Sequence, residues 1–525
     1  MPAPGDRRQR HAGVIVPTFS LRSARDWGVG EIPDLGGMAV WLAGAGQTSL
    51  HTLPMLERAA HERSPYSALS AFAIDPIHVG VDLVEDFVAS GGREALSDAD
   101  REIIARLRVA TTIDYDAVRS LKHRALERAY ASFVRTELTA DSARARRFHG
   151  FERDEAAWLV DYALYRALYA EHDDAGWRSW PDGALQAHDA RACAAARDRL
   201  AERVRYYAWV QWVVHEQLRE ARRIAGEHGV EIVGDLPFTV AVEGADVWAR
   251  QHEFDVGVSI GAPPDAFNDD GQDWALPAFR WDVVRGGGFE WLRGRVGHIG
   301  RWLDGARLDH IVGYFRTFVR PPNERPHFEP PEPRMQRELG AAALDAARGA
   351  ASGRRLLAED LGDVPDFVRE EMAARSLPGY RVLRWENDGP VFRDPRGFPP
   401  CSIATTGTHD TSSLGAWWSE ELDDAGRRAL AEVPPFAGLQ GAGAELTPAV
   451  HEALIDGLYA AGSDTALLLV QDLFGSRDRI NTPATIADAN WSYRLPEELE
   501  RLAGPAGRER AAWLRALARR HARAE

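Results

Sequence analysis

Eight short apolar runs, rich in β-branched residues and bounded by turn residues, recur along this 525-residue chain and are typical of buried strands. Helical periodicity lies between most of them, for example at residues 34–46, 207–229, 289–303 and 365–376. The segment 207–229 ends at Gly229, a usual C-terminal capping residue, directly before the third run. The runs are GVIVPTF (13–19), TSLHTLPM (48–55), VEIVGD (230–235), GARLD (305–309), RRLLAE (354–359), YRVLRW (380–385), SIATT (402–406) and TALLLVQD (465–472).

This alternation of strand and helix limits the fold to a few architectures. Strands that alternate with helices pair in parallel. Eight such units predict a closed (β/α)8 barrel, the TIM-barrel fold, and a doubly wound open sheet is the alternative. Residues 56–229 separate the second and third strands and far exceed an ordinary crossover. Since they contain amphipathic helical patterns, we expect a large helical insertion there.

The same pattern predicts the domain organisation. We expect residues 1–525 to form a single catalytic barrel unit that carries an inserted helical subdomain at 84–206. A second insertion, a loop and a helix, is expected at 320–352 after the fourth strand. It begins with the proline-rich stretch 320–334, which we interpret as a loop at the rim of the site or, alternatively, as a disordered surface loop.

Composition excludes several classes of function. The 63 basic and 79 acidic residues give a net charge of −16, which argues against binding to nucleic acid or to an anionic membrane. Only Cys193 and Cys401 are available, and no HExxH-type histidine pair occurs, so we expect no metal site. Lys122 is the only lysine and lies on a charged helix face, which argues against pyridoxal phosphate and P-loop chemistry.

Targeting signals are also lacking in the sequence pattern. No stretch approaches the ~20 apolar residues of a membrane span, and the N-terminal apolar run is too short for a signal peptide. We therefore expect a soluble cytoplasmic protein without a membrane partner, and a monomer or weak homo-oligomer.

Acidic residues stand at or just beyond the carboxyl ends of four expected strands: Asp235, Asp309, Glu359 and Asp410. In a barrel these strand ends surround one mouth, where catalytic side chains lie. Four carboxylates in one mouth repel one another, so at least one should have a raised pKa and act as an acid. The others would stay ionised, which is the pairing that glycoside chemistry uses. The alternative is that each acid caps the helix behind it.

Two basic side chains accompany these acids. Arg307 precedes Asp309 by two positions, so both point to the same face of the strand. An arginine there can orient a carboxylate and keep it ionised through bidentate hydrogen bonds. His409 stands directly beside Asp410. The combination favours a catalytic cluster over four independent helix caps.

Seven short motifs, in matching order over nearly the whole chain, make the sequence resemble the amylomaltases. These are bacterial 4-α-glucanotransferases, glycoside hydrolase family 77, related to the α-amylase clan. The motifs are SPYSALSAFA (64–73), GDLPFTVAVEGADVWA (234–249), APPDAFNDDGQDW (262–274), RLDH (307–310), AEDLG (358–362), TGTHD (406–410) and RINTP (479–483).

The resemblance implies a role for each matching residue. Asp309 would be the nucleophile that forms a covalent glucosyl intermediate, and Glu359 would be the general acid and then the base. Asp410 would bind sugar hydroxyls and distort the bound ring. The implied substrate-binding residues are Tyr66, Asp235, Arg307 and His409 on the donor side, Phe267 and Trp274 in a loop that clamps the glucan on the acceptor side, and Asn481 as a further sugar contact.

The implied activity is that of a disproportionating enzyme. It would transfer α-1,4-glucan segments to the 4-hydroxyl of an acceptor glucose or malto-oligosaccharide by a retaining double displacement, with no cofactor. An α-1,4-glucan hydrolase would use the same catalytic residues. A catalytically silent glucan-binding protein is a further alternative, against which the intact set of Asp309, Glu359 and Asp410 argues. A nucleotide-dependent glycosyltransferase lacks support because no G-x-G-x-x-G fingerprint follows any expected strand.

Overall fold

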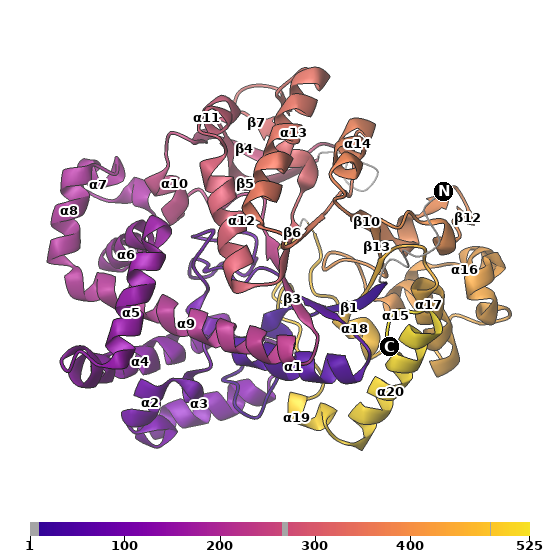
Figure 1. Cartoon of the computed structure of the whole chain (residues 1–525), viewed down its shortest axis with the longest axis horizontal. Helices are drawn as coiled ribbons and strands as arrows, with labels where there is room; N and C mark the ends of the chain where they lie inside the picture. The colour runs from indigo at the N-terminus through magenta and orange to yellow at the C-terminus, as the bar shows by residue number, and fades with distance from the viewer. Residues whose placement is uncertain (1–9, 265–270, 484) are drawn as a thin grey trace.

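A computed structural model of the chain describes residues 10–264, 271–483 and 485–525. At its centre, eight parallel strands form a nearly closed barrel in the order β10, β13, β14, β1, β2, β3, β6, β9 (Figure 1). The edge strands β9 and β10 meet where the Ala358 N–H donates to the Pro378 carbonyl over 3.0 Å. The strands are β1 (His11–Ile15), β2 (Ser49–His51), β3 (Glu231–Leu236), β6 (Gly305–Leu308), β9 (Arg355–Ala358), β10 (Gly379–Val382), β13 (Ser402–Thr405) and β14 (Thr465–Leu469).

All eight predicted strands form this barrel, so the (β/α)8 prediction is confirmed and the doubly wound open sheet is wrong. The runs are largely apolar because the barrel interior fills one face of each strand and helices cover the other. The sixth strand is shorter than expected, since residues Leu383–Trp385 form a 3-10 turn. The helices that pack around the barrel include α1 (Ile32–Gly44), α9 (Ala201–Glu227), α12 (Glu290–Trp302), α14 (Asp366–Ala374), α17 (Pro448–Tyr459) and α20 (Pro505–Arg520).

Helices fill most of the long segment between β2 and β3, as expected. Their aromatic side chains pack on α9, the helix that leads into β3: the Phe133 and Phe148 rings each lie 5.6 Å from the Trp212 ring. That residues 84–206 act as a distinct subdomain stays a prediction. The helices are α2 (Glu85–Ala89), α3 (Asp98–Val109), α4 (Tyr115–Phe133), α5 (Ala143–Asp154), α6 (Ala156–Glu171), α7 (Gly183–Gln186) and α8 (Ala190–Arg199).

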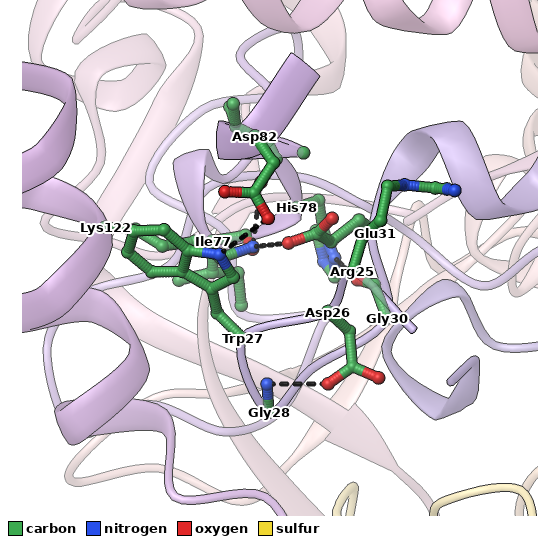
Figure 2. A network of polar contacts seen from close by, with 12 residues as sticks. Arg25, Asp26, Trp27, Gly28, Gly30, Glu31, Ile77, His78, Asp82 and Lys122 are labelled. Atoms are coloured by element: carbon green, nitrogen blue, oxygen red, sulfur yellow. Dashed lines mark hydrogen bonds and ion pairs between the residues drawn. The ribbon is translucent and has the colours of Figure 1, made fainter. Parts of the chain in front are cut away.

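A buried ion pair joins this helical segment to the barrel (Figure 2). Lys122, on α4, is buried instead of lying on an exposed charged face. Its Nζ donates to Glu31 Oε1 over 2.8 Å and to the carbonyls of Ile77 and Val79 over 2.6 and 2.8 Å. Glu31 is the N-cap residue of α1, and burial, opposed by the Lys122 charge, raises the pKa of Glu31 to about 8. The three donors of the ammonium are therefore all satisfied inside the protein.

A four-stranded antiparallel sheet, which the sequence analysis missed, stands beside the barrel mouth. Its strand order is β5, β4, β7, β8. The interpretation of residues 320–334 as one loop is wrong in part, because β8 lies in the middle of the stretch and α13 (Pro333–Ala350) begins at its end. The strands are β4 (Phe254–Ala262), β5 (Gln272–Phe279), β7 (Thr317–Arg320) and β8 (His327–Glu329). This sheet carries one wall of the cavity described below.

In the three described ranges, every helix is too short or too polar to cross a lipid bilayer.

Candidate active site

A cavity of about 770 Å³ opens at the carboxyl ends of the barrel strands. The ends of parallel strands meet at this mouth, so residues far apart in sequence become neighbours. The predicted site residues that line it are Tyr66, Trp274, Arg307, Asp309, Glu359, His409, Asp410 and Asn481. Of the remaining two, Asp235 is buried beneath the cavity, and Phe267 lies outside the described residues.

Arg307, on β6, is the centre of the polar cluster. Its Nη1 lies 2.7 Å from Asp309 Oδ1 and 2.8 Å from each carboxylate oxygen of Asp235. Its Nη2 lies 3.8 Å from Glu359 Oε2. Burial alone would lower the pKa of Arg307, but the two aspartates raise it well above its usual range. The guanidinium is therefore a permanent positive charge shared by three acids.

Asp235 supports the floor of the cavity from below. It is the last residue but one of β3, and its carboxylate accepts hydrogen bonds from Arg307 and, over 2.8 Å, from the Tyr66 hydroxyl. Burial, opposed by Arg307 and reinforced by Asp309, raises the pKa of Asp235. Through these bonds Asp235 holds Tyr66 and Arg307 in place. The donor-side role that the resemblance implies for Asp235 stays a prediction.

Glu359 follows β9, the strand next to β6. Its Oε2 accepts the His310 N–H and its Oε1 accepts the Leu361 N–H, both over 2.9 Å. Burial, opposed by Arg307 and reinforced by Asp309, raises the pKa of Glu359 to about 7. Burial, and not the predicted repulsion between carboxylates, is therefore the larger cause of this raised pKa. A carboxyl group with this pKa can both donate and accept a proton near neutral pH.

Asp410 and His409 form a second ion pair in the cavity lining. His409 Nε2 lies 3.3 Å from Asp410 Oδ2, and Asn481 Nδ2 donates to Asp410 Oδ1 over 2.6 Å. Burial would lower the pKa of His409, but Asp410 raises it; burial would raise the pKa of Asp410, but His409 lowers it. The Tyr66 ring stacks on His409 with centroids 5.0 Å apart. Asp410 is thus kept ionised while it faces the cavity.

The interpretation of the four acids as helix caps is wrong. The helical turns that follow their strands have other N-cap residues: Gly244, His310, Pro365 and Ser413. The acids are held instead by the arginine, by backbone N–H groups and by Asn481, as described above.

Several residues of the cavity wall, among them Trp491, Trp385 and His310, were missed from the sequence. Trp491 lies 5.9 Å from Tyr66 and 5.5 Å from His409, measured between ring centroids. Trp385 lies at the rim with 45% of its surface exposed. The ring of His310 meets Trp274 edge to face at 4.8 Å. The chain's 17 tryptophans hint at aromatic platforms, but a count cannot place them.

Paired acids on adjacent strands of a (β/α)8 barrel, around one arginine and under aromatic walls, define a class of enzymes that act on glycosidic bonds. A family model described as 4-alpha-glucanotransferase matches residues 16–500. The chain therefore belongs to the 4-alpha-glucanotransferase family, and both the resemblance to amylomaltases and the transferase prediction are confirmed.

Individual relatives agree with this assignment. The 4-alpha-glucanotransferase of Chlamydia pneumoniae is 26% identical over 506 residues, which cover 94% of this chain and 92% of that protein. The 4-alpha-glucanotransferase of Streptococcus pneumoniae serotype 4 is 28% identical over 502 residues, 94% of each chain. Among solved structures, the amylomaltase from Streptococcus agalactiae in complex with acarbose has a TM-score of 0.84 at 23% identity and covers 98% of this chain and 100% of that one. The amylomaltase from Corynebacterium glutamicum has a TM-score of 0.79 at 24% identity, covering 96% of this chain and 75% of that one. The two structures support the fold.

Proposed function

We propose that the cavity transfers α-1,4-glucan segments from a malto-oligosaccharide donor to the 4-hydroxyl of a second glucose or malto-oligosaccharide, with retention at the anomeric carbon. The observation that carries this proposal is the pair of Asp309 and Glu359, one bound to the Arg307 guanidinium and the other with a pKa of about 7. The first supplies a nucleophile, and the second supplies a proton that can leave and return.

In the first half-reaction, Asp309 attacks the anomeric carbon of the donor sugar. Arg307 binds Oδ1 of Asp309, which orients the carboxylate for attack through its other oxygen. Protonated Glu359 gives its proton to the glycosidic oxygen as the bond to the anomeric carbon breaks. The products of this step are a glucosyl ester on Asp309, a shortened glucan with a free 4-hydroxyl, and ionised Glu359.

In the second half-reaction, ionised Glu359 takes the proton of an acceptor 4-hydroxyl. The acceptor oxygen attacks the anomeric carbon, and the ester bond to Asp309 breaks. The His310 and Leu361 N–H groups stabilise the ionised Glu359 between the two steps. Transfer competes with hydrolysis according to how well the acceptor, rather than water, occupies this position, and the Trp274 indole supplies an apolar wall there.

The part of the cavity lining that contains Asp410, His409 and Tyr66 binds the donor sugar in this proposal. Asp410, ionised beside His409 and oriented by Asn481, accepts hydrogen bonds from sugar hydroxyls. These bonds can strengthen as the ring flattens toward the transition state. Tyr66, fixed by Asp235 and stacked on His409, offers an aromatic face to the same sugar.

We further propose that the enzyme works in the cytoplasm, as a monomer or weak homo-oligomer, on uncharged glucans. The net charge of −16 suits a substrate that carries no charge, since no anion has to be attracted.

Trapping of the intermediate tests this mechanism. Glu359→Gln, given an activated maltosyl fluoride, should form the ester but turn it over slowly, because no base remains for the second step. Mass spectrometry of the digested protein should find one maltosyl adduct on the peptide that contains Asp309, and none in Asp309→Asn. Products of inverted configuration, or an adduct on another residue, would contradict the proposal.

A further inference from the structure

His310 follows Asp309 and has a left-handed backbone, with φ 46° and ψ 58°. Few L-residues adopt this region, although histidine and asparagine do so more often than most. In this conformation the His310 N–H points at Glu359 and donates to its Oε2 over 2.9 Å. The backbone of one residue thus links the end of β6 to the acid that follows β9.

The side chain of His310 faces the other way, into the cavity wall. Its ring meets the Trp274 ring at 4.8 Å and an interplanar angle of 86°, and it lies 5.6 Å from the Phe238 ring. These contacts between the imidazole and two aromatic side chains fix the position of the His310 ring against the indole. Burial, against the pull of Asp309, lowers the pKa of His310 to about 4, so the imidazole is neutral in the working range.

The Trp274–His310 contact is also where two sheets meet. Trp274 lies on β5 of the antiparallel sheet, whereas His310 lies two residues beyond the end of barrel strand β6. His310 contacts both Trp274, through its ring, and Glu359, through its backbone N–H. The position of a sugar held against Trp274 relative to Glu359 therefore depends on His310.

We propose that His310 is a positioning residue that couples the acceptor wall to the acid and base: its ring sets the orientation of Trp274, and its backbone sets that of Glu359. This inference rests on the proposed function, because it assigns a geometry to the acceptor half-reaction. His310 would thus influence whether sugar or water completes the second step.

Substitutions at His310 can separate the role of its ring from the role of its backbone N–H. Asparagine tolerates the left-handed backbone, so His310→Asn keeps the N–H bond to Glu359 and removes the ring. We expect the acceptor KM to rise about tenfold and the hydrolysed fraction of product to increase, with the alkaline limb of the kcat profile unchanged.

His310→Val tests the second part of the proposal, the backbone hydrogen bond from His310 to Glu359. A β-branched residue resists positive φ, so the N–H to Glu359 is displaced. Since that hydrogen bond favours the ionised carboxyl, its loss should raise the pKa of Glu359 and move the alkaline limb of kcat upward. We expect kcat to fall by roughly 10- to 100-fold.

A double-mutant cycle provides the decisive experiment. Trp274→Ala, His310→Asn and the double variant are compared for the ratio of transfer to hydrolysis on maltotriose. If His310 acts through Trp274, the double variant should be no worse than Trp274→Ala alone; effects that multiply independently would overturn the coupling. His252→Asn is the matched control, since that histidine side chain is 68% exposed and is not part of the cavity lining. Thermal unfolding of each variant verifies that it is folded.

The inference and the proposed function can fail separately. If the wild-type chain forms no oligosaccharide longer than maltotriose when it is given maltotriose, the proposed function fails. If it does so and His310→Asn keeps the wild-type ratio and acceptor KM, the inference alone is overturned.

Discussion

Arg307 Nη1 lies 2.7 Å from Asp309 Oδ1, so the proposed nucleophile is paired with an arginine on β6, the strand that Asp309 directly follows. The same nitrogen binds the carboxylate of Asp235 below the cavity. The guanidinium therefore connects Asp309, which lines the cavity, to the buried carboxylate of Asp235. Loss of this guanidinium should therefore lower kcat more than it raises the KM for the glucan.

Replacing this arginine by lysine should abolish most activity. Arg307→Lys keeps the charge, but an ammonium on a flexible stem cannot reproduce the planar arrangement of donors that holds both aspartates. We expect kcat for disproportionation to fall by at least ~100-fold with a smaller change in KM. Arg334→Lys is a suitable control, because that side chain is 89% exposed. Unchanged kcat in Arg307→Lys would show that the arginine does not orient the nucleophile.

The rate should depend on pH through Glu359. The acid must be protonated in the first step, and its pKa is about 7, so kcat/KM should decline above that pH. In Glu359→Gln, kcat/KM should fall by ~100-fold or more and lose this alkaline limb. Rate profiles between pH 4 and 9 measure both effects. An alkaline limb that survives in the variant would assign the proton to another group.

Glu359 should also destabilise the fold at high pH. Its folded pKa is raised above the usual value of 4.5, so stability is full below about pH 4.5 and declines as the pH rises through about 7. Glu359→Gln removes this loss. The variant should therefore gain in melting temperature over wild type at pH 8 relative to pH 5, as differential scanning calorimetry can measure. An equal difference at both pH values would contradict the raised pKa.

Substitution of Asn481 should lower activity, because this residue orients the carboxylate of Asp410. Its Nδ2 lies 2.6 Å from Asp410 Oδ1. Asn481→Ala removes that bond, whereas Asn481→Asp places a second negative charge against Asp410. We expect kcat/KM to fall about tenfold in the first and ~100-fold in the second. If the two variants lost equal activity, charge repulsion at Asp410 would not be the cause.

The buried pair of Lys122 and Glu31 should be necessary for stability (Figure 2). Lys122→Met leaves the buried carboxyl of Glu31 without its cation, a change that typically costs ~3–5 kcal/mol. Loss of the cation raises the pKa of Glu31 further, so the stability of the variant should keep declining above about pH 8, where the contribution of Glu31 in the wild type levels off. The variant should therefore be affected less at pH 5 than at pH 9. Denaturant unfolding at the two pH values measures this. The double variant Lys122→Met, Glu31→Gln should recover part of the lost stability; no recovery would exclude the unpaired charge as the cause.

The barrel was predictable from sequence because its strands are buried on both faces and therefore read as continuous apolar runs. β14, for example, is buried at every position. The antiparallel sheet was not predictable in the same way. β4 is only partly buried and changes register along its length, and β8 has three residues. Neither gives a regular alternation that marks a strand.

The candidate site was predictable where strand ends determine position. Asp309, Glu359 and Asp410 follow barrel strands, so they had to meet at the mouth. The place of Asp235 beneath the floor depends on its contacts with Tyr66 and Arg307, which no local pattern encodes. The left-handed turn at His310 was equally hidden, because a glycine would have marked such a turn and a histidine does not.

Incubation of the purified chain with maltotriose alone, followed by separation of the products, tests the central claim most directly. The account predicts glucose together with a ladder of longer malto-oligosaccharides, since each transfer lengthens one chain while shortening another. Glucose and maltose alone would identify a hydrolase. Intact maltotriose, also after longer glucans and added acceptors are tried, would contradict the transferase account altogether.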